Sequence, residues 1–391
     1  MTYGVLDCET TTFQKGNPFS ARNRLCVVGC RIGEVDECIP IQYDPTAPYA
    51  EALVRLDYLI GSVDTLVLFN AKFDLNWLAR YGIVVPDRVA IFDCQLAEFI
   101  LDNQRTPYPS LDGCLAKRGM LGKSSSVVHE YWGAGLDTDQ IPYEDLQAYL
   151  CGDLERTDAL YQRLLSECVA DPSRDALIKL HMQDLRVLQE MEFNGELFAW
   201  DSLTDASAKA ERELDEIQNR IKDFVPEAVR THFNVDSGDH LSILLYGGSV
   251  SVKTGTPYQR TYKSGPRAGE DYIAHKWETR EHTFPQLVKP PKGSELKKKG
   301  FYSTDEETLL SLPKPKALIE LLLRRAELAK LVGTYFRGIR KLCEKYDWLD
   351  GYVHGTLNQC RVITGRLSSE KPNEQNFPEV MNEYIISRFN S

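Results

Sequence analysis

The sequence predicts an α/β fold in the N-terminal part of the chain, followed by a mainly helical region. Three apolar segments bounded by turn-like residues, 3–8, 25–32 and 65–69, are typical of strands in a sheet. Apolar residues recur at helical spacing over 73–81, 93–102 and 144–168. Strands that alternate with helices indicate helices packed on a sheet.

Beyond about residue 170 the pattern becomes helical. The spacing of apolar residues predicts helices over 173–192, 201–224 and 315–346. The segment 249–300 differs, because Pro, Gly, Lys and Tyr dominate it and little periodicity remains. This composition predicts an irregular or hairpin-rich insertion.

The bulk composition excludes several classes of protein. The 391 residues contain no apolar run long enough to span a bilayer, and the N-terminus lacks the pattern of a signal peptide. We therefore expect a cytoplasmic protein, in the cytoplasm of the host cell if a phage encodes it. The 10 cysteines include no CxxC pair, so a zinc site is not supported and reduced thiols are expected.

Charge is distributed unevenly along the chain, whose net charge is −11. Residues 1–170 hold 14 basic and 24 acidic residues, a net charge of −10. Residues 249–300 hold 11 basic and 5 acidic residues, a net charge of +6. A basic segment of this kind is what phosphate binding needs.

Five residues form a candidate catalytic set. Asp7 and Glu9 stand two apart in a predicted strand and so point to the same face. Asp74 falls in the first turn of a predicted helix, four residues after Asn70. Tyr149 and Asp153 are four apart on a helix and so are neighbours. Taken singly, each pattern is also explained by a polar strand end, a helix-capping position or a surface pair. Gly152, in the predicted helix that carries Tyr149 and Asp153, hints at a close approach of another segment there.

Taken in order, the strand DxE, the strand–helix NxxxD and the helical YxxxD resemble the proofreading 3′-5′ exonucleases, in their tyrosine subclass. The resemblance covers about residues 1–168, and Thr10, Phe69 and the pair Phe92–Asp93 agree with it. It implies an RNase H-like domain with a mixed sheet and flanking helices. Four carboxylates suit two Mg²⁺ ions, with Mn²⁺ as an alternative.

The resemblance also implies a role for each residue. Asp7 would bridge both ions, Glu9 and Asp153 would complete the first, and Asp74 would hold the second through water. Tyr149 would orient the attacking water. Thr10, Asn70 and Phe73 are expected to contact the 3′-terminal nucleotides of single-stranded DNA.

The second half resembles the family A DNA polymerases of bacteriophage type. The stretches 182–201, 233–248, 302–312 and 322–335 are similar to the junction after the exonuclease domain and to the thumb. The most specific segment is 354–378, which contains TGRLSS and PNEQN and resembles the motif that lines the primer–template minor groove. Its expected DNA contacts are Thr364, Arg366, Ser368, Ser369, Asn373, Gln375 and Asn376. Glu374 departs from the apolar residue usual there.

These resemblances give three expected regions: an exonuclease domain over 1–170, a thumb-like region over 171–353 with the basic insertion 249–300, and an incomplete start of the palm over 354–391. The end of the chain, 385–391, is similar to the lead-in to the palm strand, but the motifs of palm and fingers are absent. The chain is either one subunit of a split polymerase or a piece of a longer enzyme. We favour the split, because residues 354–391 would otherwise have no sheet to pack on.

Three functions follow as hypotheses. The first is the proofreading part of a polymerase, with primer–template DNA as a partner and with palm and fingers on a second polypeptide. The second is a stand-alone DNA exonuclease, and the third is a non-catalytic DNA-binding scaffold subunit. The insertion 249–300 is expected to clamp DNA or to dock a processivity factor, and a solvated loop is the alternative.

Overall fold

A computed structural model describes residues 2–120, 122, 127–348 and 351–387, which form two compact units. The first unit comprises residues 1–200 and 339–391, and the second comprises residues 201–338. Within the described ranges, no helix combines the length and the apolar character needed to cross a bilayer.

A five-stranded mixed sheet forms the centre of the first unit, in the order β3-β2-β1-β4-β5. Strand β1 pairs antiparallel with β2 and parallel with β4, and β4 pairs parallel with β5. The strands are β1 (Tyr3–Thr10), β2 (Leu25–Ile32), β3 (Val35–Pro40), β4 (Thr65–Leu68) and β5 (Ala90–Asp93). Apolar residues of β1, β2 and β4 are buried, as the three apolar segments predicted. The predicted α/β fold with a mixed sheet is confirmed.

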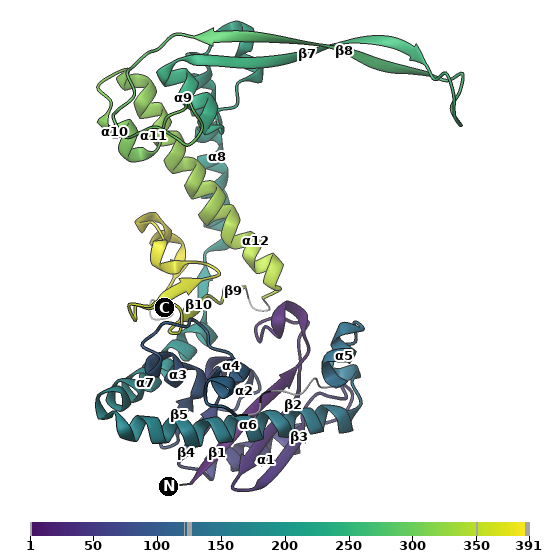
Figure 1. The fold of residues 1–391 in the computed structure, drawn as a ribbon, viewed down its shortest axis with the longest axis vertical. Coiled ribbons are helices and arrows are strands. Elements are labelled where there is room, and N and C mark those ends of the chain that lie inside the picture. Colours follow the sequence, from purple (N-terminus) through teal and green to yellow (C-terminus); the bar gives the residue numbers. More distant parts are fainter. Residues whose placement is uncertain (1, 121, 123–126, 349–350, 388–391) are drawn as a thin grey trace. The chain divides into compact units, whose positions relative to one another are not determined.

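Helices pack on this sheet (Figure 1). They are α1 (Ala50–Gly61), α2 (Ala71–Arg80), α3 (Cys94–Leu101), α4 (Leu111–Lys117), α5 (Val127–Gly133), α6 (Tyr143–Ala170) and α7 (Pro172–Asn194). Helix α6 runs across the sheet and contacts β1, β2, β3 and β4. The predicted helices over 73–81, 93–102, 144–168 and 173–192 correspond to α2, α3, α6 and α7.

The close approach of α6 to the sheet lies at Gly29 on β2. A Cβ atom added to Gly29 would lie 2.8 Å from Leu150 Cγ and 2.9 Å from Leu154 Cδ1. The expectation that Gly152 marks a close approach is wrong, because a Cβ there would meet only the guanidinium of Arg156, at 3.3 Å. Because Gly29 of β2 has no side chain, α6 can pack closely against the sheet at this position.

Replacing Gly29 by Ala is expected to destabilise the protein by about 1–3 kcal/mol, because the new methyl group overpacks the contact with Leu150. Urea unfolding measures the loss. Gly133→Ala is the control, since no atom of the part of the chain that the structure describes lies within 4 Å of a Cβ atom at Gly133. Equal unfolding midpoints for the two variants would contradict this account of how α6 is seated.

The C-terminal segment packs within the first unit. Strands β6 (Glu196–Phe198), β9 (Tyr352–Val353) and β12 (Ile385–Ile386) form a three-stranded sheet, and β10 (Thr356–Asn358) pairs with β11 (Ser368–Glu370). The expectation that residues 354–391 would have no sheet to pack on is therefore wrong for the described part, because β12 pairs with β6 of this chain. Residues 388–391 of the predicted palm lead-in lie outside the described ranges.

The second unit is mainly helical. Its helices are α8 (Trp200–Lys222), α9 (Gly238–Tyr246), α10 (Glu306–Ser311) and α11 (Lys316–Lys330), with a 3₁₀ segment over Glu227–His232. The single helix expected over 315–346 is instead α11, a π-helical turn (Leu331–Phe336) and α12 (Arg337–Tyr346). The turn contains Gly333, and glycine weakens a regular helix.

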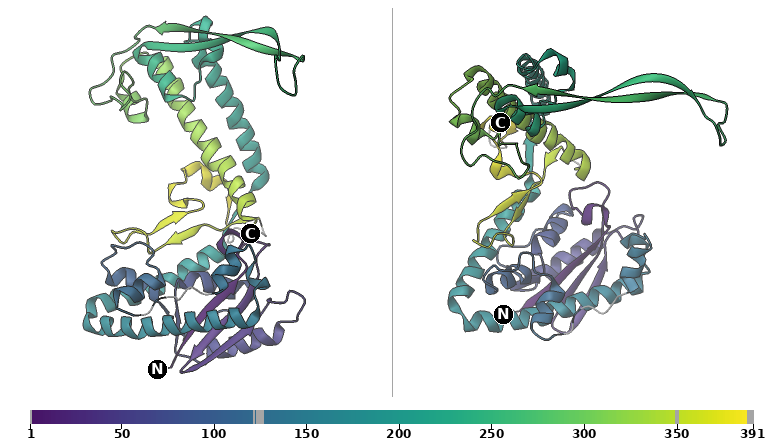
Figure 2. Two further views of the ribbon diagram at one scale, coloured as in Figure 1. Left: turned by 45° about the vertical axis from the view of Figure 1, so that its right-hand side comes forward. Right: turned by 45° about the horizontal axis from the view of Figure 1, so that its top comes forward.

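The basic insertion forms a long hairpin of β7 (Gly248–Thr261) and β8 (Asp271–Phe284). Val250, Val252 and Phe284 are buried at its base beside α9. Beyond this base the residues are mostly exposed on both faces of the ribbon. Figures 1 and 2 show the ribbon extending away from the helices of its own unit. The hairpin-rich alternative for this segment agrees with the structure.

Candidate active site

Three carboxylates meet at the end of β1. Asp7 and Glu9 project from the same face of the strand, and Asp153 reaches them from α6. One carboxylate oxygen from each of the three lies within 4.8 Å of the others. Asp153 and Glu9 are buried, and Asp7 is partly buried. Carboxylates this close repel one another in a poorly solvated place unless cations compensate them.

Tyr149 and Arg156 flank this cluster on α6. The Tyr149 hydroxyl forms a hydrogen bond with Asp153, one turn further along the helix. Burial raises the pKa of Tyr149, and the negative charges of Glu9 and Asp153 raise it further. The phenol is therefore a hydrogen-bond donor at neutral pH. The Arg156 guanidinium donates to Asp153 Oδ1 at 2.6 Å and offsets part of the local negative charge.

Asp74 lies directly behind the cluster on α2. Its side chain is 1% exposed, and its Oδ1 accepts a hydrogen bond from the backbone N–H of Cys8 at 3.0 Å. Burial raises the pKa of Asp74 well above its usual range, and the charge of Asp7 adds to this. The bond to the strand residue between Asp7 and Glu9 fixes Asp74 to β1. Asp74 is not one of the three mutually close carboxylates among the described residues.

Asp93 holds the start of α2 in place. Its Oδ1 accepts from the backbone N–H groups of Asn70 and Gln95 at 3.0 and 2.8 Å, and from that of Leu96 at 3.3 Å. Its Oδ2 accepts from the N–H of Ala71 at 3.0 Å. One buried carboxylate thus caps the N-termini of both α2 and α3. Burial raises the pKa of Asp93, and the four N–H groups oppose that shift.

Asn70 precedes α2, as predicted, but its side chain makes no capping bond. Its backbone is left-handed, with φ 65°, a conformation that asparagine tolerates better than most residues. Because Asp93 supplies the cap, the Asn70 side chain remains exposed beside the pocket described next. Thr10 is buried and donates to its neighbour Thr11 O at 3.1 Å.

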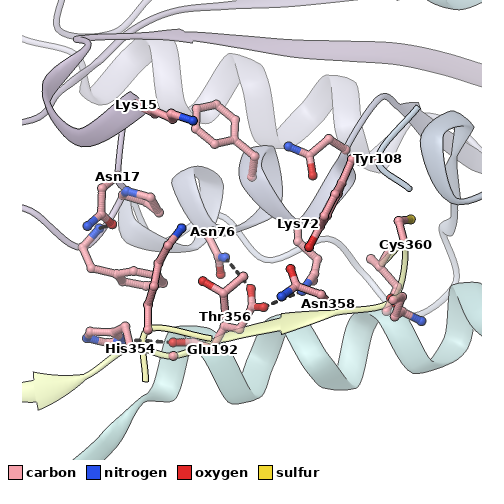
Figure 3. Close-up of a pocket in the computed structure, with 18 of the residues that line it drawn as sticks. Lys15, Asn17, Lys72, Asn76, Tyr108, Glu192, His354, Thr356, Asn358 and Cys360 are labelled. Carbon is pink, nitrogen blue, oxygen red and sulfur yellow. Dashed lines mark hydrogen bonds and ion pairs between the residues drawn. The ribbon is translucent and has the colours of Figure 1, made fainter. Parts of the chain in front are cut away.

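A pocket of about 300 Å³ adjoins this region within the first unit (Figure 3). Asn70 and Phe73 line it, together with Lys15, Tyr108 and Asn358. Thr10 and Phe73 lie on either side of Gly16, where an added Cβ atom would collide with Thr10 Oγ1 and lie 3.2 Å from Phe73. The structure therefore brings together the three residues predicted to contact a DNA 3′ end.

One wall of the pocket is a buried polar network centred on Glu192 of α7. Lys72 donates both to the Glu192 carboxylate and to Leu357 O. The N–H of Leu357 donates to Glu192 Oε1 at 2.6 Å, and Asn76 Nδ2 donates to Oε2 at 3.3 Å. Figure 3 shows this network beside Asn358, whose buried Nδ2 has no hydrogen-bond partner among the described residues. Helix α2, which carries Asp74, is thus tied to strand β10.

The residues predicted to contact primer and template lie on and around β11. Thr364, Arg366, Asn373, Gln375 and Asn376 are exposed. Ser369 is buried and organises the turn, because its hydroxyl donates to Asn373 Oδ1 at 3.0 Å and accepts from Gln375 N at 3.2 Å. Ser368 pairs with Asn358 across the strands. The exposed amides of Asn373, Gln375 and Asn376 therefore share one ordered turn after β11, and Arg366 precedes that strand.

Glu374 lies in the same turn, in an unfavourable place for a carboxylate. A Cβ atom added to Gly355 would collide with its Oε1, so the side chain packs on that glycine. Burial raises the pKa of Glu374 to about 7, and the charges of Glu196 and Glu192 contribute further. An apolar or amide side chain would avoid this cost.

Replacing Glu374 by Gln is expected to stabilise the protein at high pH only. The pKa of Glu374 in the folded state is about 7, above its ordinary value of 4.5. The stability that the protonated carboxyl contributes is therefore complete below about pH 4.5 and lost as pH rises through about 7. Glu374→Gln should gain on the order of 3 kcal/mol at pH 8 and less than about 1 kcal/mol at pH 5. Urea unfolding at both pH values measures this, with the exposed Glu379→Gln as control; the same gain at both pH values would contradict it.

Several residues of the site were not predicted. Arg156 stands three residues after Asp153, so helical spacing could have indicated its contact with that carboxylate. Lys72 is part of the NxxxD segment, but its partner Glu192 is 120 residues away. Nothing in the local sequence marks Asn358 or Glu192 as neighbours of α2.

Two regions of the chain match known protein families. The family model described as 3′-5′ exonuclease matches residues 4–169, and the model described as DNA polymerase family A matches residues 279–388. The chain therefore contains a 3′-5′ exonuclease domain of the kind associated with DNA polymerase, followed by part of a family A polymerase region.

Curated relatives agree with this division. DNA polymerase I of Synechocystis sp. is 28% identical over 362 residues, which are 90% of this chain and 31% of that protein. DNA polymerase I of Pseudomonas aeruginosa is 27% identical over 79% of this chain and 29% of its own length. The DNA polymerase of Bacillus phage SP01 is 24% identical over 83% of this chain and 35% of its own length. The chain thus spans about a third of the length of these relatives.

Among solved structures, the fold is similar to that of the POL domain of Pol1 from M. smegmatis in complex with DNA primer-template and dNTP. The TM-score is 0.62 at 18% identity, over 96% of this chain and 52% of that chain. This similarity shows the fold alone.

Proposed function

We propose that the chain removes nucleotides one at a time from the 3′ ends of DNA, as the proofreading part of a family A DNA polymerase. The observation that carries the proposal is the cluster of Asp7, Glu9 and Asp153, whose carboxylate oxygens lie within 4.8 Å of one another. It lies in the domain that matches the exonuclease family. Asp74 and Tyr149 adjoin it.

The donor set fits Mg²⁺ or Mn²⁺. Three close carboxylates offer hard oxygen ligands, and their mutual repulsion is what divalent cations relieve. Asp7, Glu9, Asp153 and, behind them, Asp74 are the residues that would hold two such ions. When bound, these cations supply a nucleophilic water at neutral pH and stabilise the leaving oxygen.

The other groups of the site position substrate and water. The Tyr149 hydroxyl, held by its bond to Asp153, would orient the attacking water by hydrogen bond. Arg156 holds Asp153 in place. Thr10, Asn70 and Phe73 would receive the terminal nucleotides, because Asn70 and Phe73 line the pocket and Thr10 lies near Phe73 at Gly16. A single strand suits such a site, since the terminal bases must leave the duplex to enter it.

Replacing Tyr149 by Phe tests this mechanism. The variant is expected to lower kcat for 3′-end hydrolysis by about 10–100-fold with little change in KM, because the lost hydroxyl acts on the attacking water. Steady-state kinetics on a short single strand measures both constants. Tyr131→Phe is the matched control, since its hydroxyl also donates to a carboxylate, Asp145, at 3.0 Å, outside the site. Equal kcat values for the two variants would contradict the role of Tyr149.

As part of a polymerase, the chain would have three functional regions: the exonuclease over 1–170, a thumb-like region over 171–353, and the start of a palm over 354–391. Thr364, Arg366, Ser368, Ser369, Asn373, Gln375 and Asn376 would contact primer and template, which the exposure of most of them permits. This division differs from the compact units, because residues 171–200 and 339–391 belong to the same unit as the exonuclease.

The proposed polymerase also needs a palm and fingers. Palm and fingers would come from a second polypeptide in a split enzyme of phage type, acting in the cytoplasm of the host. Co-purification of this chain with a polypeptide carrying palm and fingers motifs would support the split. A gene in which such motifs continue the same reading frame would contradict it. A processivity factor at 249–300 stays a prediction.

A further inference from the structure

The long hairpin of β7 and β8 has two faces of different chemistry. The strands pair in unbroken register from Gly248 opposite Phe284 to Thr261 opposite Asp271. Because side chains alternate between the faces of a strand, the register decides which residues of the two strands share a face. A two-stranded hairpin without further support is only marginally stable in water, so a surface that covers it would add to its stability.

One face gathers the positive charge, and we call it the basic face. It consists of Tyr258 and Arg260 on β7 with Tyr272, Lys276, Glu278 and Arg280 on β8. The opposite face, which we call the apolar face, carries Pro257, Ile273 and Trp277 together with Lys253 and the acids Asp271 and Glu281. The basic face thus has three basic residues and one acidic residue, whereas the apolar face has one basic and two acidic residues.

The cations of the basic face are available for a ligand. Arg260 and Lys276 have no acidic partner among the residues that the structure describes. Arg280 pairs with Glu278 at 3.5 Å, but both side chains are exposed, and pairs of this kind contribute little in water. Acidic side chains therefore neutralise the three positive charges of the basic face only weakly.

The spacing of these cations is regular. Arg260 lies opposite Tyr272, and Lys276 and Arg280 follow at steps of four residues along β8. Four residues of a strand extend about 13 Å, which is close to the width of the DNA major groove, about 12 Å. A twisted two-stranded ribbon fits that groove in other proteins. Neighbouring cations on this face could then reach phosphates on the two sides of a groove.

We propose that the basic face of the hairpin binds the phosphates of duplex DNA through Arg260, Lys276 and Arg280. The inference rests on the proposed function in one respect, namely that DNA is the substrate. Charge complementarity favours DNA over a protein, because these cations stand out in a chain whose net charge is −11. A protein docked on Ile273 and Trp277 is the competing outcome of the test.

The test compares two triple variants of the full 391-residue chain. One variant removes the basic face, as Arg260→Gln, Lys276→Gln and Arg280→Gln. The other removes the same number of positive charges from the same segment, as Lys253→Gln, Lys289→Gln and Lys292→Gln. Fluorescence anisotropy with a labelled primer–template duplex gives Kd at several salt concentrations between 50 and 200 mM. A third variant, Ile273→Ser with Trp277→Ser, removes the apolar face.

The basic-face variant is expected to bind more weakly and to reduce the slope of log Kd against log salt by about 2 to 3, since each lost phosphate contact lowers it by about 0.9. The control and the apolar-face variant should keep the slope of the unaltered chain. Equal slopes for both triple variants, or a loss of DNA binding only in the apolar-face variant, would overturn the proposal. Nuclease activity is measured separately. A chain that binds duplex DNA with the expected slopes but does not hydrolyse 3′ ends would contradict the proposed function and not the role of the basic face.

Discussion

Replacing Asp7 by Asn is expected to lower the rate of 3′-end hydrolysis by about three orders of magnitude. Asp7 is the member of the three-carboxylate cluster that also acts on Asp74, because its carboxylate is close to those of Glu9 and Asp153 and its charge raises the pKa of Asp74. Losing it would remove a ligand from both proposed cation positions, and cations of this kind supply several kcal/mol of transition-state stabilisation.

The same substitution should not destabilise the fold when divalent cations are absent. Asn is nearly isosteric with Asp and removes one charge from a cluster whose members repel one another. Thermal unfolding in EDTA should therefore give a Tm equal to or above that of the unaltered chain. Asp57→Asn, an exposed position on α1, is the control for activity. A variant with normal activity would refute the role assigned to Asp7, and one with a lower Tm in EDTA would contradict the repulsion within the cluster.

The second large effect is expected at Asp93. Asp93→Ala leaves four backbone N–H groups at the starts of α2 and α3 without their acceptor. A cost of about 3–5 kcal/mol follows, because unsatisfied buried donors and two lost caps add together. Activity should fall as well, since α2 carries Asp74.

Two matched variants separate this account from general core damage. Asp93→Asn keeps one carbonyl oxygen and should cost about half as much. Ser110→Ala removes a single cap, the bond from Gly113 N to Ser110 Oγ at 3.1 Å, and should cost about 1 kcal/mol. Urea unfolding ranks the three variants. An Asp93→Ala variant no less stable than Ser110→Ala would contradict the double cap.

Local periodicity and the resemblance to the proofreading exonucleases together predicted the carboxylate cluster. Alternation along a strand placed Asp7 and Glu9 on one face, and helical spacing placed Tyr149 beside Asp153. The order of the motifs then joined residues that are distant in the chain. The double cap by Asp93 was not predicted, because Asn70 is itself a residue type that caps helices, and only the fold shows that its side chain is not used.

Contacts between distant segments could not be predicted from the sequence, for a physical reason. Glu192 meets Lys72 and Leu357 only because α7 and β10 pack beside α2, and no local spacing encodes that arrangement. The hairpin shows the same limit in another form. Composition predicted a basic insertion, but the separation of its charges onto one face depends on strand register, which only the structure supplies.

Asp7, Glu9 and Asp153 are proposed to form a metal-dependent 3′-5′ exonuclease site. The most direct measurement follows a single strand labelled at its 5′ end during incubation with the chain and Mg²⁺, beside a reaction in EDTA. We expect a ladder of products shortened one nucleotide at a time from the 3′ end, absent in EDTA and absent with Asp7→Asn. An intact strand in every reaction, or a ladder that persists in EDTA or with Asp7→Asn, would contradict it.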